Sequence, residues 1–320
     1  MKKVISLIIC AALLAVSAFS FVSCSNGNEK PTVGIIQFGT HASLNNCYEG
    51  IMQGLAEKGY TEENCNFEYV ISNFDGTVSA SQAQMMVNKN VDVIIAIATP
   101  SAVAAATAAD GDIPVVFCAV TDASTMENYE NITGSSDIPN FDKQLELVTS
   151  FMGKSELKIG VLYSTEESSS PIQVANLKKA AGKYASMEIC DSVVADITTI
   201  DTKVNELISR GVDCFVNLLD NTVVGKLESN ILPITNDAGI PVFGSEIEQV
   251  KVGCAASASI EYIDVGIAAG IAAARILSGE SADVIPVAVI DTPSVCYNGK
   301  VCEKLGLTVP ENTGAENVAE

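Results

Sequence analysis

The sequence has no tryptophan and only one histidine, His41, among its 320 residues. A serine or cysteine triad would have to use that histidine, and no G-x-S-x-G motif supplies a nucleophile on a strained turn. The metalloprotease motif H-E-x-x-H and the phosphate-binding motif G-x-x-x-x-G-K are missing as well. We therefore expect no catalytic residues, no metal site and no cofactor, and we do not expect an enzyme.

Positive charge is scarce. The chain has 18 lysine and arginine residues against 39 aspartate and glutamate residues, which gives a formal net charge of −21. Nucleic-acid binding requires clustered cations that displace counterions, so we expect no nucleic-acid partner. A net charge this negative is expected instead to keep the protein soluble and away from anionic surfaces.

The ten cysteines follow no zinc-binding spacing, because none of them belongs to a close C-x₂₋₄-C pair. A disulfide framework mostly serves small secreted domains and is not expected in a chain of this length. Cys118 and Cys214 lie inside apolar runs, where we expect them to act as small core residues.

The N-terminus has the pattern of an export signal, since two lysines precede an apolar run from Val4 to Val22. Cys24, just after this run, resembles the lipidated cysteine of a bacterial lipoprotein. We therefore expect a signal peptide at 1–23, a lipidated Cys24 and a linker at 24–30. An uncleaved signal anchor is the alternative, because the run is close to the membrane-spanning length of about 20 residues. Both alternatives place the folded part outside the cytoplasm and at the membrane.

Residues 91–98 form a continuous apolar run, which predicts a strand buried on both faces of a parallel sheet. Thr99 and Pro100 end this run and are typical of a helix start, and residues 102–109 fit that helix. In open α/β sheets, a helix that begins at the carboxyl end of a strand commonly borders the ligand site and favours anions.

The same pattern recurs at 211–222, where the spacing from Asp92 to Thr99 is repeated from Asp213 to Asp220. Two neighbouring strands are repeated in the same order: 33–37 matches 159–163, and 113–117 matches 240–243. We therefore predict an α/β fold of two Rossmann-like lobes with parallel sheets. Equivalent loops of the two lobes would then line one cleft.

Stretches rich in small and polar residues suggest that the chain crosses between the lobes three times, at about 119–140, 252–259 and 282–291. We expect lobe 1 to comprise residues 31–120 and 260–282, and lobe 2 to comprise residues 121–259 and 283–309. Residues 310–320 are acidic and are expected to form a disordered tail.

Candidate ligand contacts lie in the loops at the strand ends. The turn Thr99-Pro100-Ser101 could bind a ligand carboxylate, although an ordinary helix cap would look the same. Its counterpart Asp220-Asn221-Thr222 would face it across the cleft. Asp122 and Glu246 follow equivalent strands of the two lobes, and their carboxylates could pair with a ligand ammonium or merely cap turns. The residues that precede them, Thr121 and Ser245, are candidates as well.

Four further side chains complete the candidates. His41 lies in the first loop of lobe 1, where it could contact a ligand or be a structural polar residue. Ser169 and Ser170 occupy the equivalent loop of lobe 2. Tyr262, at the second crossing, could stack on a ligand, but packing against the hinge is the simpler expectation.

Five segments together resemble the solute-binding proteins of ABC importers, in the branch called tryptophan-binding-protein-like (TrpX-like). They are AIATP at 96–100, AVTD at 119–122, KQLEL at 143–147, DNT at 220–222 and IPVF at 240–243. The resemblance covers about 31–307 and implies a type I periplasmic-binding-protein fold, in which a three-crossing hinge lets two lobes close on a small ligand. Several members of the branch are associated with aromatic amino acids. Two positions depart from the family pattern, since Ala42 replaces a frequent proline and Ser169 a frequent asparagine.

We therefore predict the solute receptor of an ABC importer, lipid-anchored on the extracytoplasmic face of the cell membrane and working with permease and ATPase subunits. The expected ligand is an amino acid, either aromatic or large and apolar. A receptor that feeds a signalling system, and an importer receptor for a nucleoside or sugar, are the alternatives. A repressor-type regulator is not expected, because the chain has an export leader and no N-terminal helix-turn-helix.

Overall fold

The computed structural model describes residues 30–290, 294–311 and 313–319. The expected signal peptide, the lipidated Cys24 and nearly all of the linker lie outside these residues. Within the described ranges, no helix combines the length and the apolar character needed to span a membrane.

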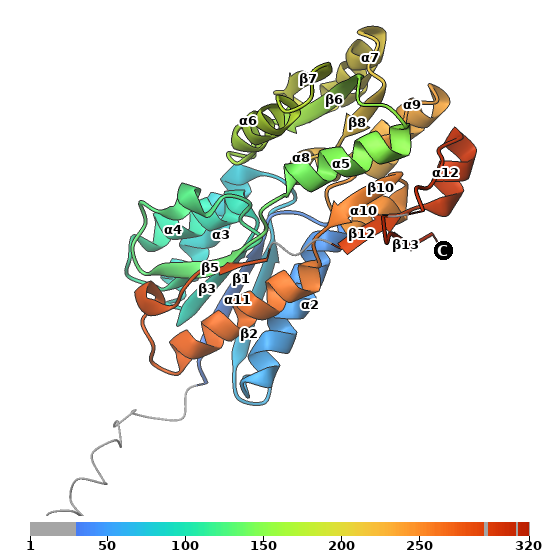
Figure 1. Cartoon of the computed structure of the whole chain (residues 1–320). Helices are drawn as coiled ribbons and strands as arrows, with labels where there is room; N and C mark the ends of the chain where they lie inside the picture. The colour runs from blue at the N-terminus through green and yellow to red at the C-terminus, as the bar shows by residue number, and fades with distance from the viewer. Residues whose placement is uncertain (1–29, 291–293, 312, 320) are drawn as a thin grey trace, which may run out of the picture. The chain divides into compact units, whose positions relative to one another are not determined.

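Six parallel strands form one sheet, in the order β11-β5-β4-β3-β1-β2 (Figure 1). Helices cover both of its faces, which explains why strands such as β3 are apolar throughout. Val93 and Ile95 pack toward α2 and α11, whereas Ile94 and Ala96 pack toward α3 and α4. The elements are β1 (Thr32–Gln37), α2 (Ala42–Glu57), β2 (Asn66–Ile71), α3 (Gly76–Asn88), β3 (Val93–Ile97), α4 (Thr99–Ala109), β4 (Val115–Cys118), β5 (Ile132–Ser136), α11 (Tyr262–Leu277) and β11 (Ala288–Val289).

A second sheet has four parallel strands in the order β7-β6-β8-β9. Its two faces are covered by α5 and α6 and by α7 to α10. The elements are α5 (Phe141–Met152), β6 (Leu157–Ser164), α6 (Ser170–Ala181), β7 (Met187–Val194), α7 (Ile200–Ser209), β8 (Cys214–Val216), α8 (Asn221–Val224), α9 (Leu232–Asp237), β9 (Val242–Phe243) and α10 (Ile247–Val252).

A small third sheet adjoins the second, because the N–H of Ala255 donates to the carbonyl of Val242 at 2.7 Å. It contains β10 (Ala256–Ser259), β12 (Ser294–Tyr297) and β13 (Glu316–Asn317). Helix α12 (Gly299–Leu305) connects β12 to β13. Short 3₁₀ and π turns complete the described chain: η1 (Ala123–Met126), η2 (Ile197–Thr199), η3 (Leu227–Ile231) and η4 (Ala282–Val284).

The repeated aspartates of the sequence make the same bond in both lobes. Asp92 precedes β3 and accepts the N–H of Thr32, the first residue of β1, at 2.7 Å. Asp213 precedes β8 and accepts the N–H of Lys158, at the start of β6, also at 2.7 Å. Each aspartate therefore aligns the central strand of its sheet with the neighbouring strand. This equivalence confirms the predicted α/β fold of two similar lobes.

Helices α2 and α11 approach each other closely because glycines line their contact. A Cβ on Gly266 would lie 2.2 Å from the carbonyl oxygen of Cys47, and a Cβ on Gly50 would lie 2.2 Å from that of Ile263. No side chain fits at such distances, so the backbones themselves are in contact. This contact joins the N-terminal part of the chain to a helix more than 200 residues later.

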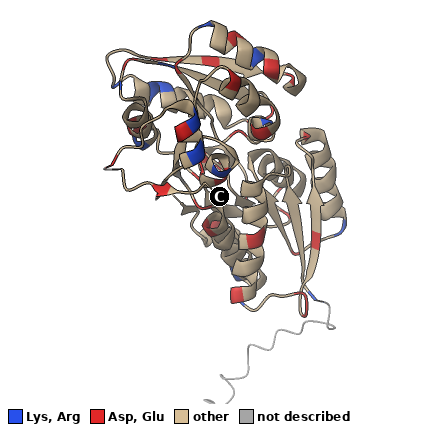
Figure 2. Ribbon diagram, turned by 90° about the vertical axis from the view of Figure 1, so that its right-hand side faces the viewer, with Lys and Arg blue, Asp and Glu red and all other residues tan. Residues whose placement is uncertain are grey.

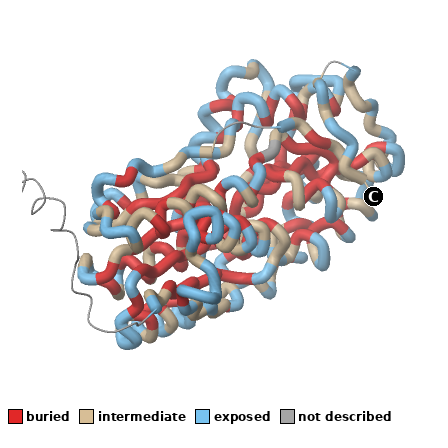
Figure 3. The backbone as a smooth tube through the Cα atoms, turned by 90° about the horizontal axis from the view of Figure 1, so that it is seen from below, coloured by how far each residue is buried: buried red, intermediate tan, exposed pale blue. Residues whose placement is uncertain are grey.

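Buried residues gather along the strands, while the outer turns of the helices are exposed (Figure 3). All eight cysteines of the described residues are buried thiols. Cys118 and Cys214 belong to the cores of the two lobes, as their apolar surroundings predicted.

The structure corrects several details of the predicted organisation. The chain crosses between the sheets after β5, after β10 and after β11, so the first and third crossings fall within the predicted spans 119–140 and 282–291. The first lobe nevertheless extends beyond its predicted boundaries at residues 120 and 282, because β5 and β11 belong to its sheet. Strand β5 pairs with β4 and was missed because Ile132 to Ser136 contains small polar residues in place of an apolar run. Gly134 permits this pairing, since a Cβ there would lie 2.0 Å from the carbonyl oxygen of Phe117. The tail also contains ordered structure, because β13 pairs with β12.

Candidate functional site

Three strand ends of the first sheet hold strained backbone conformations. Phe74, Ala98 and Ala119 follow β2, β3 and β4 and have φ angles of 62°, 78° and 56°. Positive φ is costly for residues with a Cβ, and such outliers cluster at ligand-binding sites. The carboxyl ends of parallel strands are also where open α/β sheets bind ligands. This edge of the sheet is therefore the candidate site.

Loops at this edge touch loops of the second sheet. Nε2 of His41, which precedes α2, lies 3.1 Å from Oδ1 of Asn221, the first residue of α8. The ring of Phe74 lies against Gly225, because a Cβ on that glycine would be 3.0 Å from Cζ of the ring. The two lobes thus meet around a shared region.

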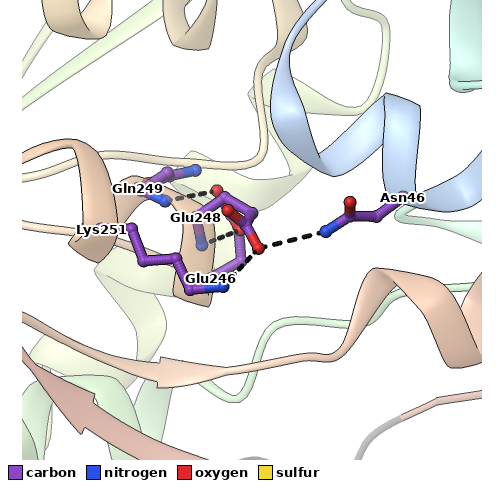
Figure 4. A network of polar contacts seen from close by, with 5 residues as sticks. All are labelled: Asn46, Glu246, Glu248, Gln249 and Lys251. Carbon is purple, nitrogen blue, oxygen red and sulfur yellow. Dashed lines mark hydrogen bonds and ion pairs between the residues drawn. The ribbon is translucent and has the colours of Figure 1, made fainter. Parts of the chain in front are cut away.

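Helix α10 adds a second contact between the lobes (Figure 4). Nδ2 of Asn46 in α2 donates to Oε1 of Glu248 at 3.1 Å, and Lys251 pairs with the same oxygen at 2.9 Å. Glu246 caps α10, because its carboxylate accepts the N–H groups of Glu248 at 2.7 Å and of Gln249 at 2.9 Å. The predicted ligand residue Glu246 thus also has a structural role.

Two cavities of about 560 Å³ each border these contacts, a size in the usual range for small-molecule sites. A third, tiny cavity of about 10 Å³ has room for roughly one water molecule. Both lobes contribute to each cavity. The first is lined by Ser43, Gly225, Glu246 and Gln249 among others, the second by Phe74, Ser164 and Thr222 among others, and the smallest by His41, Ser43, Leu44, Ala119, Leu219, Asn221, Val224, Glu246, Gln249 and Tyr262.

Four buried polar atoms around these cavities have no hydrogen-bond partner within the described part of the chain: His41 Nδ1, Asp137 Oδ1, Thr222 Oγ1 and Gln249 Nε2. Three of these residues line the cavities. The fourth, Asp137, accepts the hydroxyl hydrogen of Tyr262 at 2.5 Å, and Tyr262 lines the smallest cavity. An unpaired buried polar group costs about 1–3 kcal/mol. Their concentration in one region indicates a site for a polar ligand that completes them.

The site is also rich in buried acids. Asp137, Glu167, Asp220 and Glu246 are each at most 1% exposed, whereas no lysine or arginine of the described residues is buried. Burial raises the pKa of Asp137 to about 6 and that of Glu246 to about 7. Burial and the nearby Asp220 carboxylate raise the pKa of Glu167 to about 8. These acids suit a ligand with a positive group.

Ion pairs of the described chain lie instead at the surface, where their side chains remain partly exposed. Figure 2 shows basic and acidic residues interspersed along the helices. Most of these cations lie away from the buried acids of the site. Two lie at its border: Lys251 pairs with Glu248 beside Glu246, and Lys226 lines the second cavity.

Asp220 uses its carboxylate within the protein. It accepts the N–H of Ser164 at 2.6 Å, the hydroxyls of Ser164 at 3.0 Å and Ser170 at 2.7 Å, and the N–H of Val223 at 3.1 Å. Burial raises the pKa of Asp220, and these donors oppose that shift. The carboxylate therefore holds both ends of the loop between β6 and α6 against the start of α8, at the edge of the site.

The other predicted residues of the first lobe lie at or near the strand ends. Thr99 is buried and lies near Glu167 of the second lobe, whose pKa it lowers against the larger effect of burial. Ser101 lies 3.2 Å from the hydroxyl of Ser79, and Pro100 occupies the first turn of α4. Thr121 lies near the buried Asp137 and favours its ionised form. Asp122 is half-buried and caps η1 through the N–H of Ser124, outside the linings of the three cavities.

In the second lobe, Ser169 and Ser170 are fully buried beside Glu167 and Asp220. The hydroxyl of Ser245 donates to the carbonyl of Asn217 at 2.6 Å. The structure thus brings most of the predicted residues to one region, but several of their polar atoms already form hydrogen bonds within the protein.

Four residues of the site were not predicted: Phe74, Asp137, Glu167 and Gln249. Glu167 lies in the same loop as Ser169, and its burial was not visible in the sequence. Asp137 follows the unrecognised strand β5, and Gln249 lies on the unrecognised helix α10. Phe74 carries a positive φ that propensity does not predict for an aromatic residue.

Comparison with known proteins gives clear relatives. The chain is 32% identical to the tyrosine-binding protein of Clostridioides difficile (strain R20291), and the match covers 99% of this chain and 95% of that protein. Among solved structures, an ABC domain from Streptococcus pneumoniae in complex with L-Trp is 29% identical with a TM-score of 0.85, covering 90% of this chain and all of that chain.

A ligand-free, open structure of a substrate-binding protein with adhesive properties, from Clostridium difficile, is also 29% identical, with a TM-score of 0.67 and coverage of 90% and 99%. The family model for the ABC transporter substrate-binding protein matches residues 32–318, nearly the whole described chain. Together with the two-lobed fold and the polar interlobe site, this match shows that the chain belongs to the family of ABC transporter substrate-binding proteins.

Proposed function

We propose that this ABC importer receptor binds an amino acid, aromatic by preference, between its lobes. The observation that carries this proposal is the group of buried acids and unpartnered polar atoms, which has no buried lysine or arginine beside it within the described residues. An amino acid offers both a cation for the acids and a carboxylate for the donors. The relatives named for tyrosine and solved with L-Trp support the same ligand class.

The ammonium would lie near Asp137 and Glu246. Asp137 has one oxygen without a partner, and Glu246 borders two of the cavities. The carboxylate would face donors from the other side, namely Nε2 of Gln249 and the first turn of α4 at Thr99 to Ser101, which favours anions.

Apolar surfaces would take the ligand side chain. Val224, Leu227 and Val252 line the first of the two large cavities, and Phe74 offers a ring at the border of the second. Aromatic pairs contribute about 0.5–1.5 kcal/mol beyond the area that they bury. A ligand ring against Phe74 would therefore gain affinity that an aliphatic side chain lacks.

Binding would close the lobes about the three-crossing hinge. At equal identity, the described arrangement is more similar to the relative with L-Trp than to the ligand-free, open relative. The His41–Asn221 and Asn46–Glu248 contacts would belong to this closed form.

ABC substrate-binding proteins act outside the cytoplasm and deliver ligand to a permease driven by ATPase subunits. We propose that this protein is held there by a lipid on Cys24, which follows the apolar leader. Metabolic labelling with a palmitate analogue tests this anchor. Label in the wild type and none in Cys24→Ser would support it, and equal labelling would refute it.

The ligand is tested by thermal shift and titration calorimetry of the purified protein against the common amino acids, nucleosides and sugars. We expect L-Tyr or L-Trp to stabilise the protein most, and mass spectrometry to recover the ligand unchanged. The matched variants are Glu246→Gln, which should weaken binding, and Glu156→Gln on an exposed loop, which should not. Stabilisation by sugars or nucleosides alone would refute the amino-acid proposal.

A further inference from the structure

Glu167 is a buried acid of the second lobe that lies beside the contact between the lobes. Its Oε2 accepts Nδ2 of Asn221 at 2.6 Å, and the hydroxyl of Ser169 lies 3.4 Å from Oε1. Thr99, at the start of α4 in the first lobe, lies near the same carboxyl and lowers its pKa. One carboxyl group therefore lies beside elements of both lobes.

Asn221 continues this connection to His41. Because its Nδ2 donates to Glu167, its Oδ1 faces Nε2 of His41 at 3.1 Å. Nε2 must then carry the imidazole hydrogen, which leaves Nδ1 as a bare acceptor. Burial lowers the pKa of His41 to about 4, so the ring is neutral at physiological pH. Glu167, acting through Asn221, thus fixes the tautomer of His41 and leaves Nδ1 as an acceptor without a partner.

The neighbours of Glu167 supply no positive charge. Asp220, its close acidic neighbour, accepts four hydrogen bonds that favour its ionised form. His41 is neutral, and within the described residues no lysine or arginine is buried. Two buried carboxylates without a cation are unfavourable, so one of them holds a proton. The proton belongs on Glu167, because burial and Asp220 raise its pKa to about 8 and it accepts fewer hydrogen bonds.

We infer that Glu167 is a positioning residue that works as the neutral acid, so that closing the lobes on an amino acid takes up one proton from solvent. The inference rests on the proposed function. In the closed form, one oxygen of Glu167 accepts from Asn221, and its O–H is available to Thr99 or Ser169. When the lobes separate, the carboxyl regains water and releases the proton.

Affinity should therefore depend on pH in a defined direction. A carboxyl whose pKa is raised on closure binds a proton between its ordinary pKa and the raised value of about 8. The association constant should fall as pH rises through this window, by roughly tenfold between about pH 6.5 and 7.5.

The test is titration calorimetry of the full-length protein with L-Tyr or L-Trp in buffers of different ionisation enthalpy. We expect uptake of about one proton in the wild type near neutral pH. Glu167→Gln keeps an acceptor and a donor at this position, so it should bind within a few-fold of the wild type, without this uptake and with a flat pH profile. Glu167→Ala should lose affinity, and the surface variant Glu156→Gln should behave as the wild type.

The outcomes separate this inference from the proposed function. Tight binding without proton uptake in the wild type would overturn the proton inference and leave the receptor proposal intact. Uptake that persists in Glu167→Gln would place the proton on Glu246 or Asp137 and overturn the assignment. If no amino acid binds at any pH while another solute does, both proposals fail.

Discussion

Tyr262 donates its hydroxyl hydrogen to Oδ2 of Asp137 at 2.5 Å, next to two of the crossings between the lobes. This bond favours the carboxylate, although burial is the larger effect and raises the pKa of Asp137 to about 6. In Tyr262→Phe the pKa of Asp137 should rise further, so less carboxylate is present near pH 6. We expect affinity for an aromatic amino acid to fall roughly tenfold at about pH 6, and less at about pH 8.

Titration calorimetry at both pH values measures this difference relative to the wild type. Tyr129→Phe is the matched control, since the Tyr129 hydroxyl lies 3.3 Å from Thr107 in an exposed pair. Equal losses at both pH values would contradict an ionised Asp137 as the ammonium partner.

Gly225 allows the lobes to meet at Phe74, and Gly225→Ala should hinder closure. The new Cβ would lie 3.0 Å from the ring, a steric conflict that typically costs about 1–3 kcal/mol. Ligand affinity should fall about tenfold or more, and small-angle scattering should show a larger radius of gyration. Gly182→Ala is the control, because both glycines end helices at φ −61° and Gly182 has more room. Wild-type affinity in Gly225→Ala would show that the contact does not limit closure.

Gly266→Ala should destabilise the fold. The added Cβ would meet the carbonyl of Cys47 at 2.2 Å and push α2 and α11 apart, which we expect to cost about 3 kcal/mol or more. Chemical denaturation measures the loss. Gly76→Ala, at the start of α3, has its nearest neighbour at 3.7 Å and should change stability by less than about 1 kcal/mol. Similar stabilities for the two variants would refute the close contact.

Asp220→Ala distinguishes a structural from a ligand-binding role. Removing a buried acceptor of four hydrogen bonds should lower the free energy of unfolding by about 3 kcal/mol or more. Asp75→Ala removes an exposed cap that accepts only the N–H groups of Thr77 and Val78, and should cost about 1 kcal/mol. If Asp220→Ala loses no more stability than Asp75→Ala but binds ligand about 1–3 kcal/mol more weakly, the residue contacts ligand as the sequence predicted.

Repetition made the fold predictable. The spacing from Asp92 to Thr99 recurs at Asp213 to Asp220 because each aspartate bonds the start of a neighbouring strand, and a helix begins one strand length later. Such a repeated local spacing can be recognised in a single sequence. Strand β5 was missed for the opposite reason, since its burial comes from neighbours and not from its own small, polar residues.

The site was less predictable, because its properties depend on contacts between distant segments. The serines at 169 and 170 looked like ligand contacts, yet Ser170 bonds Asp220 and both surround the unnoticed Glu167. The pKa of Glu167 depends on Asp220, 53 positions away by their residue numbers, and on Thr99, which belongs to the other lobe. No pattern of neighbouring residues in the sequence reveals such contacts between distant segments.

The buried thiols described above give the protein a built-in reporter of its own opening. Each of the eight is buried, away from reagents in solution. A thiol-reactive dye can therefore label these positions only as fast as the surrounding backbone opens. Cys47 and Cys118 belong to one lobe, and Cys214 and Cys302 to the other. Mapping the labelled peptides over time would show which lobe opens first, without any engineered probe.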